Sequence, residues 1–275
     1  MAEVDLHLHT NQSDGRLTPA ELIALVAARG LKVVAVTDHD ITDGLEPALA
    51  AAVAHPQLTI IPGVELSTDI PGNEVHILGY YIRYEDLSFQ ATLARFRDDR
   101  VGRAQEMVRR LAEMGMPLEW EQVREIAGEG AIGRPHIAQA LIEKGYVTGR
   151  QEAFDKYLGR NGPAYAEREK ITPEEAVRLI ASVGGVPVMA HPSYTDDLEN
   201  VLEGLVAAGL KGMEVHYAQY DEKVRAGLAE VAERHGLIPC GGTDYHATDV
   251  EGEHLPGEIG PPMETVERLK ALAEG

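Results

Sequence analysis

Histidine and carboxylate side chains follow short apolar runs near the start of this 275-residue chain. His7 and His9 come at the end of the first run, and His39 follows the second, Val34-Ala35-Val36, within the sequence Thr-Asp-His-Asp. Side chains two residues apart on a strand point to the same side, so His7 and His9 can chelate one ion. Asp14 lies five residues further on and adds a carboxylate oxygen.

The same pattern recurs along the chain, and this recurrence argues against a chance arrangement of polar strand ends. Each further run ends in or carries a histidine, an aspartate or a glutamate: Glu65, His76, His191, Asp244 and His246. The nine candidate ligands are too many for one ion. Imidazoles and carboxylates without thiolates suit Mn²⁺, Fe²⁺ or Zn²⁺, and the residue types do not choose among these metals.

The elements that must position these ligands alternate between strand and helix. Residues 2–82 predict strand, helix, strand, helix, strand and strand, with a helix start at Thr18-Pro19. A second helix start at Thr172-Pro173 resumes the alternation. Apolar strands alternating with helices predict a parallel sheet covered by helices, here with about seven strands. When such a parallel sheet closes into a barrel, the active site lies at the carboxyl ends of the strands, and the candidate ligands lie at these ends. Later strands are expected near residues 186–190, 212–216 and 237–240, and a closing helix from about Met263.

The middle of the chain differs in pattern and in charge. From Asp86 apolar residues recur every three to five positions, which predicts a long amphipathic helix ending near Gly115. Shorter helices are expected around residues 120–127, 135–144 and 151–158. Residues 86–170 contain 14 basic and 14 acidic residues, so the remainder carries the whole net charge of −20. We therefore expect a helical insertion that caps the barrel.

Composition narrows the classes of protein to which the chain can belong. A net charge of −20 argues against extended binding to a nucleic-acid backbone. Cys240 is the single cysteine, so we expect no intramolecular disulfide, a buried thiol and a reducing compartment. The chain opens into a strand without a leader, and no apolar run approaches the length of about 18 residues that a membrane span needs. These features predict a cytoplasmic protein with no membrane partner.

The ordered motifs resemble those of the PHP (polymerase and histidinol phosphatase) family of metal-dependent phosphoesterases. They are His-x-His, the aspartate five residues on, Thr-Asp-His-Asp, Gly-Val-Glu, Val-His-Ile, Ala-His-Pro and Gly-Thr-Asp-x-His, and they run from His7 to His246. The resemblance implies an α/β fold, a distorted (β/α)₇ barrel of the PHP type. Residues 1–85 and 171–275 would form the barrel domain, and residues 86–170 an α-helical insertion that forms a cap domain.

The resemblance also implies three metal ions in one centre, with Mn²⁺ favoured and Fe²⁺ or Zn²⁺ open. Carried over by motif, three sets of residues would hold them: His7, His9, Glu65 and Asp244; Asp14, His39 and His246; and Glu65, His76 and His191. A metal-bound hydroxide, held by Glu65, Asp244 and His246, would attack the phosphate in line. Asp5, Asp38 and Asp40 are expected to orient neighbouring ligands. Either His216 or a metal-bound water would protonate the leaving group.

A narrower resemblance concerns the substrate. The runs Arg-x-x-Arg-Ala-Gln-x-Met and Arg-Pro-His-Ile-Ala look like the branch that includes the 3′,5′-nucleoside bisphosphate phosphatase and 5′→3′ RNA-trimming exoribonucleases. Arg100 and Arg103 lie one helical turn apart, and Arg134 with His136 begins a helix, so these residues can bind a second phosphate. The implied partner is a small phosphorylated nucleotide, such as 3′-phosphoadenosine 5′-phosphate, or short 5′-phosphorylated RNA.

Two other functions remain open at the level of sequence. A histidinol-phosphate phosphatase would need one phosphate site and a pocket for an imidazole alcohol. A non-catalytic metal-binding PHP module would keep the fold without turnover, although every ligand position is filled here.

Overall fold

A single sheet of seven strands lies at the centre of the described part of the chain. The structure is a computed structural model and describes residues 1–70, 73–128, 130–167, 171–248 and 252–275. The strands are hydrogen-bonded in sequence order, and a parallel bridge between Leu8 and Tyr245 joins the segments that follow the first and last strands. The sheet is thus a nearly closed barrel, and the predicted α/β barrel is confirmed. The strands are β1 (Val4–Asp5), β2 (Val33–Val36), β3 (Thr59–Ile70), β4 (Asn73–Tyr80), β5 (Val186–Met189), β6 (Gly212–Glu214) and β7 (Ile238–Cys240).

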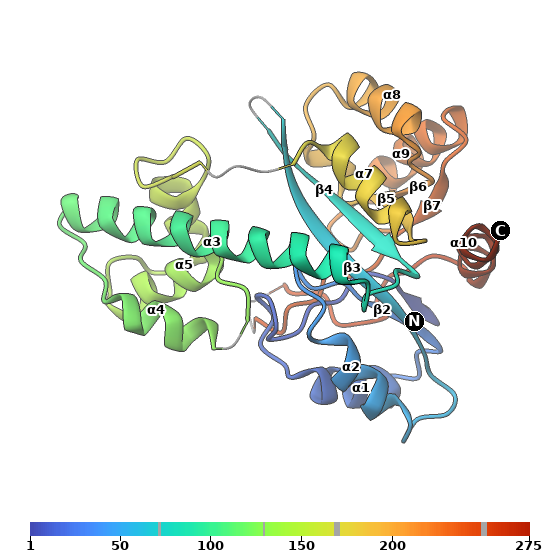
Figure 1. The fold of residues 1–275 in the computed structure, drawn as a ribbon, viewed down its shortest axis with the longest axis horizontal. Coiled ribbons are helices and arrows are strands. Elements are labelled where there is room, and N and C mark those ends of the chain that lie inside the picture. The colour runs from blue at the N-terminus through green and yellow to red at the C-terminus, as the bar shows by residue number, and fades with distance from the viewer. Residues whose placement is uncertain (71–72, 129, 168–170, 249–251) are drawn as a thin grey trace.

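Helices cover the outside of the barrel (Figure 1). All four residues of β2 and of β5 are buried, as expected for strands covered on both faces. The predicted helix starts are confirmed, because Thr18 and Thr172 each cap a helix in a capping box. The covering helices are α1 (Pro19–Ala28), α2 (Leu45–Ala52), α7 (Pro173–Ser182), α8 (Leu198–Ala208), α9 (Glu222–Arg234) and α10 (Met263–Glu274).

The prediction of a parallel sheet is wrong for β4. This strand runs antiparallel to both β3 and β5, whereas the other neighbouring strands are parallel. Only two residues of the sequence separate Ile70, the end of β3, from Asn73, the start of β4. A parallel pair requires a crossover of a dozen or more residues. Because the connection is this short, the two strands form an antiparallel hairpin.

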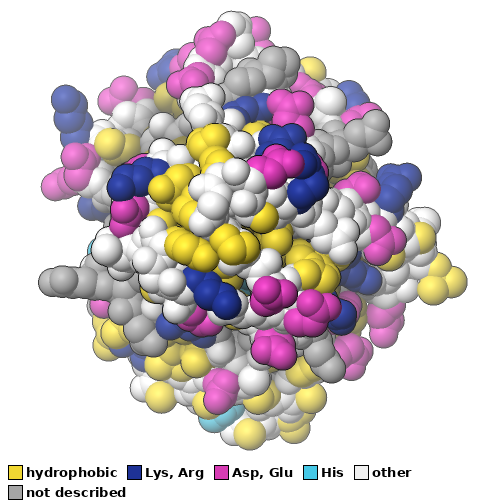
Figure 2. All heavy atoms as spheres, turned by 90° about the vertical axis from the view of Figure 1, so that its left-hand side faces the viewer, with side chains coloured by type: hydrophobic (Ala, Val, Ile, Leu, Met, Phe, Trp, Pro, Cys, Tyr) yellow, Lys and Arg dark blue, Asp and Glu magenta, His cyan; other side chains and the backbone are white. Residues whose placement is uncertain are grey.

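The helices between β4 and α7 extend to one side of the barrel (Figure 1). The first half of α3 packs into the barrel core through Phe89 and Leu93, while Met107 and Leu111 in its second half join a separate apolar cluster with α4 and α5. Figure 2 shows this end of the molecule, where basic and acidic side chains are interspersed around an apolar patch. The helices are α3 (Leu87–Glu113), α4 (Trp120–Ala127), α5 (Arg134–Glu143) and α6 (Arg150–Ala153), followed by a π-helical turn at Phe154–Leu158.

Close backbone contact occurs where the last strand returns to the first. A side chain on Gly242 would collide with the Asp5 carboxylate and with the backbone of His7, so only glycine fits there. Cys240 is fully buried in the barrel, as its apolar surroundings in the sequence predict. None of the described helices is both long and apolar enough to cross a membrane.

Candidate metal and phosphate site

The nine predicted ligands come together at one rim of the barrel, although the first and last are separated by most of the chain. Asp14 Oδ1 lies 3.2 Å from His246 Nε2, and His9 Nε2 lies 3.1 Å from Asp244 Oδ1. His191 Nε2 lies 3.2 Å from Glu65 Oε1. Ligands from residues 7–76 therefore share a pocket with those from 191–246.

The strands differ in how they deliver these side chains. His7, His39, His191 and Asp244 follow the ends of β1, β2, β5 and β7, as expected of a barrel site. Glu65 instead lies in the middle of β3, because β3 and β4 continue beyond the rim. An isolated parallel bridge joins His39 to Glu65 three residues beyond the end of β2, where Val36 pairs with Pro62.

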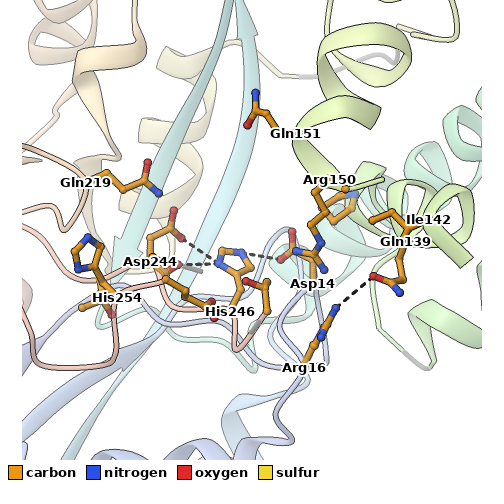
Figure 3. Close-up of a pocket in the computed structure, with 16 residues that line it drawn as sticks. Asp14, Arg16, Gln139, Ile142, Arg150, Gln151, Gln219, Asp244, His246 and His254 are labelled. Carbon is orange, nitrogen blue, oxygen red and sulfur yellow. Dashed lines mark hydrogen bonds and ion pairs between the residues drawn. The ribbon is translucent and has the colours of Figure 1, made fainter. Parts of the chain in front are cut away.

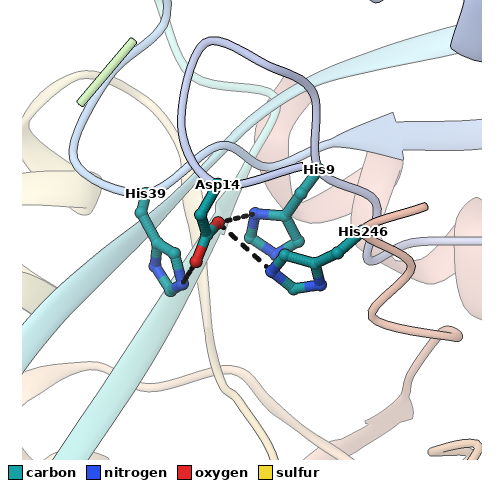
Figure 4. Close-up of side chains that lie close together, drawn as sticks. All are labelled: His9, Asp14, His39 and His246. Carbon is teal, nitrogen blue, oxygen red and sulfur yellow. Dashed lines mark ion pairs between the residues drawn. The ribbon is translucent and has the colours of Figure 1, made fainter. Parts of the chain in front are cut away.

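Three groups of these side chains have ligand atoms within 4.8 Å of one another. The groups are His7, His9, Glu65 and Asp244; His9, Asp14, His39 and His246; and His39, Glu65 and His76. The first has the membership that the sequence motifs imply, and the second adds His9 to the implied set (Figure 4). The third group contains His39 in place of the expected His191. His191 instead lies near the Oε1 atom of Glu65.

The carboxylates of the cluster are held in their charged form. Burial opposes ionisation, but the facing imidazoles hold the pKa values of Asp14, Glu65 and Asp244 well below their usual range. In the same surroundings burial opposes the charged form of His9, but Asp244 and Glu65 raise its pKa to about 10. Burial lowers the pKa of His39 to about 3, so this ring stays neutral.

The donor geometry fits divalent metal ions. Among the described residues, His9 Nε2, Asp14 Oδ1, His39 Nδ1 and His76 Nε2 are buried and have no hydrogen-bond partner. Buried polar atoms normally find such a partner, and these four residues belong to groups whose ligand atoms lie within 4.8 Å of one another, close enough to share an ion. Imidazole nitrogens and carboxylate oxygens at this spacing are ligands that Mn²⁺, Fe²⁺ and Zn²⁺ accept.

The backbone is strained at three positions around this rim. Asp40, His191 and Asp244 have φ angles of 54°, 30° and 54°, in the left-handed region that non-glycine residues rarely adopt. Strained backbone of this kind costs about 1–3 kcal/mol per residue and clusters at functional sites.

The three aspartates expected to orient ligands bind the surrounding loops. Asp5 accepts hydrogen bonds from Thr243 N and Thr243 Oγ1 and from Gly257 N, at 3.0, 2.7 and 3.0 Å. Asp38 accepts from Thr10 Oγ1 at 2.7 Å, and Asp40 accepts from Arg100 Nε at 2.7 Å. They hold the segments that carry the ligands and not the imidazole rings themselves.

Sequence reasoning missed Glu214, at the end of β6. Its Oε1 accepts a hydrogen bond from His7 Nδ1 at 3.0 Å, and its Oε2 accepts from His191 N at 2.7 Å. His7 Nε2 is thereby turned towards Glu65 and Asp244, 3.2 Å from each. The signal in the sequence is a carboxylate at a strand end, two residues before His216.

His216 lies apart from the cluster. Burial, followed by the nearby Arg225, lowers its pKa. Among the described residues, its ring makes no hydrogen bond or ion pair with a candidate ligand. Tyr217, the next residue, does reach the site and donates a hydrogen bond to Asp244 Oδ2 at 2.7 Å.

The predicted phosphate-binding arginines line a small cavity beside the cluster. Arg100, Arg103 and Arg134 enclose about 160 Å³ together with Asp14, His39 and His76. Arg100 is bound by Asp40 and Ser67, and Arg134 is paired with Glu74 at 2.5 Å.

The two remaining members of this set make local contacts. Arg103 donates to Ala166 O at 2.8 Å and lies over the ring of Tyr165. His136 Nδ1 accepts a hydrogen bond from Gly133 N at 2.9 Å, so it caps α5 and does not face the cavity as a charged ligand. Burial lowers the pKa of His136, which agrees with a neutral ring.

A larger cavity of about 720 Å³ also borders the cluster (Figure 3). Asp14, Asp244 and His246 form its inner wall. Arg16 of the barrel and Arg150 of the helical insertion also line it. The cluster thus borders two cavities of different size.

Comparison with known proteins agrees with this geometry. The PHP domain family matches residues 5–99. The chain is 35% identical to the 3′,5′-nucleoside bisphosphate phosphatase of Chromobacterium violaceum, over 99% of this chain and 94% of that protein. It is also 35% identical to the 5′-3′ exoribonuclease Rnm of Salmonella typhimurium, over 88% of this chain and 84% of that protein.

A solved structure shares the whole fold. A Bifidobacterium adolescentis protein described as a metal-dependent phosphoesterase superposes with a TM-score of 0.89 at 29% identity, over 98% of this chain and 96% of that one. Motifs, fold and full-length similarity therefore agree, and the chain belongs to the PHP family of metal-dependent phosphoesterases.

Proposed function

We propose that this enzyme hydrolyses the 3′-phosphate ester of nucleotides that also carry a 5′-phosphate. Its substrates are 3′,5′-nucleoside bisphosphates, such as 3′-phosphoadenosine 5′-phosphate, and short 5′-phosphorylated oligoribonucleotides. The observation that carries the proposal is the arginine-lined cavity, which shares Asp14, His39 and His76 with the ligand cluster. Two neighbouring anion sites suit a substrate with two phosphates.

The ligand cluster is the proposed site of three divalent ions, with Mn²⁺ favoured. The first is assigned to His7, His9, Glu65 and Asp244, the second to Asp14, His39 and His246, and the third to Glu65, His76 and His191. Bound divalent ions neutralise charge on a transferring phosphoryl group and lower the pKa of water. The alternating imidazole and carboxylate groups support this assignment, since no single ion can use them all.

The arginines of the smaller cavity position the second phosphate. Asp40 and Ser67 hold Arg100 through its Nε and Nη2 atoms, so the guanidinium has a fixed orientation. Arg134 is fixed by Glu74 and by packing of its guanidinium over Phe154, 5.6 Å from the ring centre. Arginines fixed in this way bind a phosphate with little further loss of side-chain entropy.

The proposed reaction is a simple hydrolysis. A water oxygen bonds to phosphorus, the bond between phosphorus and the 3′-oxygen breaks, and the 3′-oxygen takes up a proton to leave as a hydroxyl group. Glu65 and Asp244 are close enough to the imidazoles to hold a water at the centre of the cluster. The products are a nucleoside 5′-phosphate and either inorganic phosphate or a shortened RNA.

The helical insertion, residues 86–170, is the proposed cap domain over the barrel of residues 1–85 and 171–275. Its separate apolar cluster supports this division, although α3 packs in both parts. The substrates named here arise inside cells, which favours a cytoplasmic location.

Neither alternative function is favoured. A histidinol-phosphate phosphatase would not need three arginines beside the metal cluster. A non-catalytic module is disfavoured because all nine ligand positions are filled and converge. The two relatives compared above over most of the chain are named for activities on nucleotides or RNA.

The test is an assay of purified, Mn²⁺-loaded protein with 3′-phosphoadenosine 5′-phosphate, 5′-phosphorylated trinucleotide RNA and histidinol phosphate. We expect turnover of the first two and little of the third. Glu65→Gln should abolish turnover and release metal, whereas Arg134→Ala should raise KM for the bisphosphate more than it lowers kcat. Preferred hydrolysis of histidinol phosphate, or full turnover by Glu65→Gln, would contradict the proposal.

A further inference from the structure

The larger cavity lies between the barrel and the helical insertion, and the proposed reaction of a bisphosphate leaves it without a role. Its volume of about 720 Å³ is within the range of small-molecule binding sites, whereas the arginine cavity of about 160 Å³ is below it. Both cavities border Asp14 and Pro135, so a ligand at the cluster can extend into either one.

Two guanidinium groups face the larger cavity from opposite domains. Arg16 donates a hydrogen bond to Gln139 Oε1 at 3.3 Å, which links the barrel to the insertion (Figure 3). Arg150 is half-buried, and burial, followed by the positive charge of Arg16, lowers its pKa, although the charges of Asp14 and Glu253 act in the opposite direction. In the part of the chain that the structure describes, no carboxylate lies within ion-pair distance of Arg150.

Arg150 thus differs from Arg100 and Arg134, which are paired with Asp40 and Glu74. In a chain with a net charge of −20, a half-buried arginine beside a second arginine is unusual. Like charges held close together are unfavourable, and an anion placed between them removes that repulsion.

We propose that the larger cavity binds the nucleotide that follows the scissile phosphate in an oligoribonucleotide, with Arg150 and Arg16 binding its next phosphate. This inference rests on the proposed function and selects the substrate class within it. In a nucleoside bisphosphate the scissile phosphate is terminal, so no nucleotide follows it into this cavity. In RNA the same bond between phosphorus and the 3′-oxygen breaks, but the phosphate carries the rest of the strand.

The other lining residues suit a nucleotide. Gln139, Gln151 and Gln219 present amide groups that can both donate and accept hydrogen bonds to sugar hydroxyls and base edges. Because single-stranded RNA is bound through its backbone charges and exposed bases, a cavity with arginines and amides is chemically matched to it.

The experiment compares Arg150→Ala with Arg150→Lys and with the control Arg124→Ala, an exposed arginine on α4 that does not line the cavity. Binding of fluorescent 5′-phosphorylated trinucleotide RNA to metal-free protein is measured by anisotropy at several salt concentrations. Turnover of the trinucleotide and of 3′-phosphoadenosine 5′-phosphate is measured in parallel.

We expect Arg150→Ala to weaken trinucleotide binding about tenfold, because it loses a charged hydrogen bond to phosphate. The slope of log affinity against log salt should fall by about 0.7, the value for one contact to a single strand. Hydrolysis of the bisphosphate should stay within about twofold, lysine should restore part of the binding, and Arg124→Ala should match the wild type.

A second variant distinguishes loss of RNA binding from misfolding of Arg150→Ala. Gln151 is exposed at the cavity, so Gln151→Glu should fold normally and still repel the incoming phosphate. Unchanged trinucleotide binding in both Arg150→Ala and Gln151→Glu would overturn the inference, as would an equal loss on the bisphosphate. If the wild type hydrolyses neither nucleotide, the proposed function fails, while the binding measurement still decides whether this cavity takes RNA.

Discussion

Replacing Glu214 by glutamine tests whether the barrel interior sets the orientation of two candidate ligands. Glu214 is fully buried and uses one oxygen for His7 Nδ1 and the other for His191 N, at 3.0 and 2.7 Å. Glutamine has nearly the same shape but only one acceptor oxygen. One of the two donors would then face an NH₂ group.

The magnitude follows from that mismatch. An unsatisfied buried donor costs about 1–3 kcal/mol. If His7 instead changes tautomer, its proton moves to Nε2, the atom that lies 3.2 Å from both Glu65 and Asp244, and the ring can no longer donate a lone pair there. Loss of such supporting contacts typically lowers metal affinity about 10–100-fold, which agrees with 1–3 kcal/mol.

The assay is calorimetric titration of Mn²⁺ into chelator-treated protein, with turnover and thermal unfolding measured on the same samples. Glu203→Gln, an exposed change of the same type on α8, is the matched control and should bind metal like the wild type. Wild-type affinity and turnover in Glu214→Gln would refute the argument that this carboxylate positions His7.

Three further outcomes are expected. Although burial disfavours their charged forms, Asp244 and Glu65 raise the pKa of His9 to about 10, and Glu65 raises the pKa of His76 to about 9. Against the same opposition from burial, Asp244, Glu214 and Glu65 raise the pKa of His7 well above its usual range. All three rings are therefore charged at pH 7 without metal, so Mn²⁺ binding should release about three protons and strengthen from pH 6 to 8. Calorimetry in buffers of different ionisation enthalpy would show no proton release if this is mistaken. For the same reason metal-free protein should lose stability as pH rises from 6.5 through 9 to 10. Histidines with a raised pKa contribute fully to stability below the pKa of the unfolded state, and this contribution disappears above the pKa of the folded state. Denaturant unfolding at pH 6.5 and 9.5 measures the difference, and equal stability would speak against it. Met107→Ala, in the apolar cluster of the insertion, should lower the free energy of unfolding by about 2–5 kcal/mol. It should also increase proteolysis of residues 86–170, while metal binding by the barrel persists. Faster cleavage in the barrel instead would contradict separate cores.

Local sequence patterns determined the elements and the list of candidate ligands. Apolar runs ending in histidine or carboxylate marked the strands, and the Thr-Pro-x-Glu motif marked the starts of α1 and α7. The helix expected at 120–127 has those bounds in the structure. These features depend on side-chain periodicity and capping, which act over a few residues and can be recognised without the fold.

Only the tertiary structure decided which of these groups meet. Glu214 lies 207 positions from His7, and Arg100 lies 60 positions from its partner Asp40. The larger cavity exists only because the insertion lies across the barrel rim and places Arg150 opposite Arg16. Such contacts depend on strand register, on the antiparallel course of β4 and on the docking of α3, and no local periodicity encodes these long-range choices.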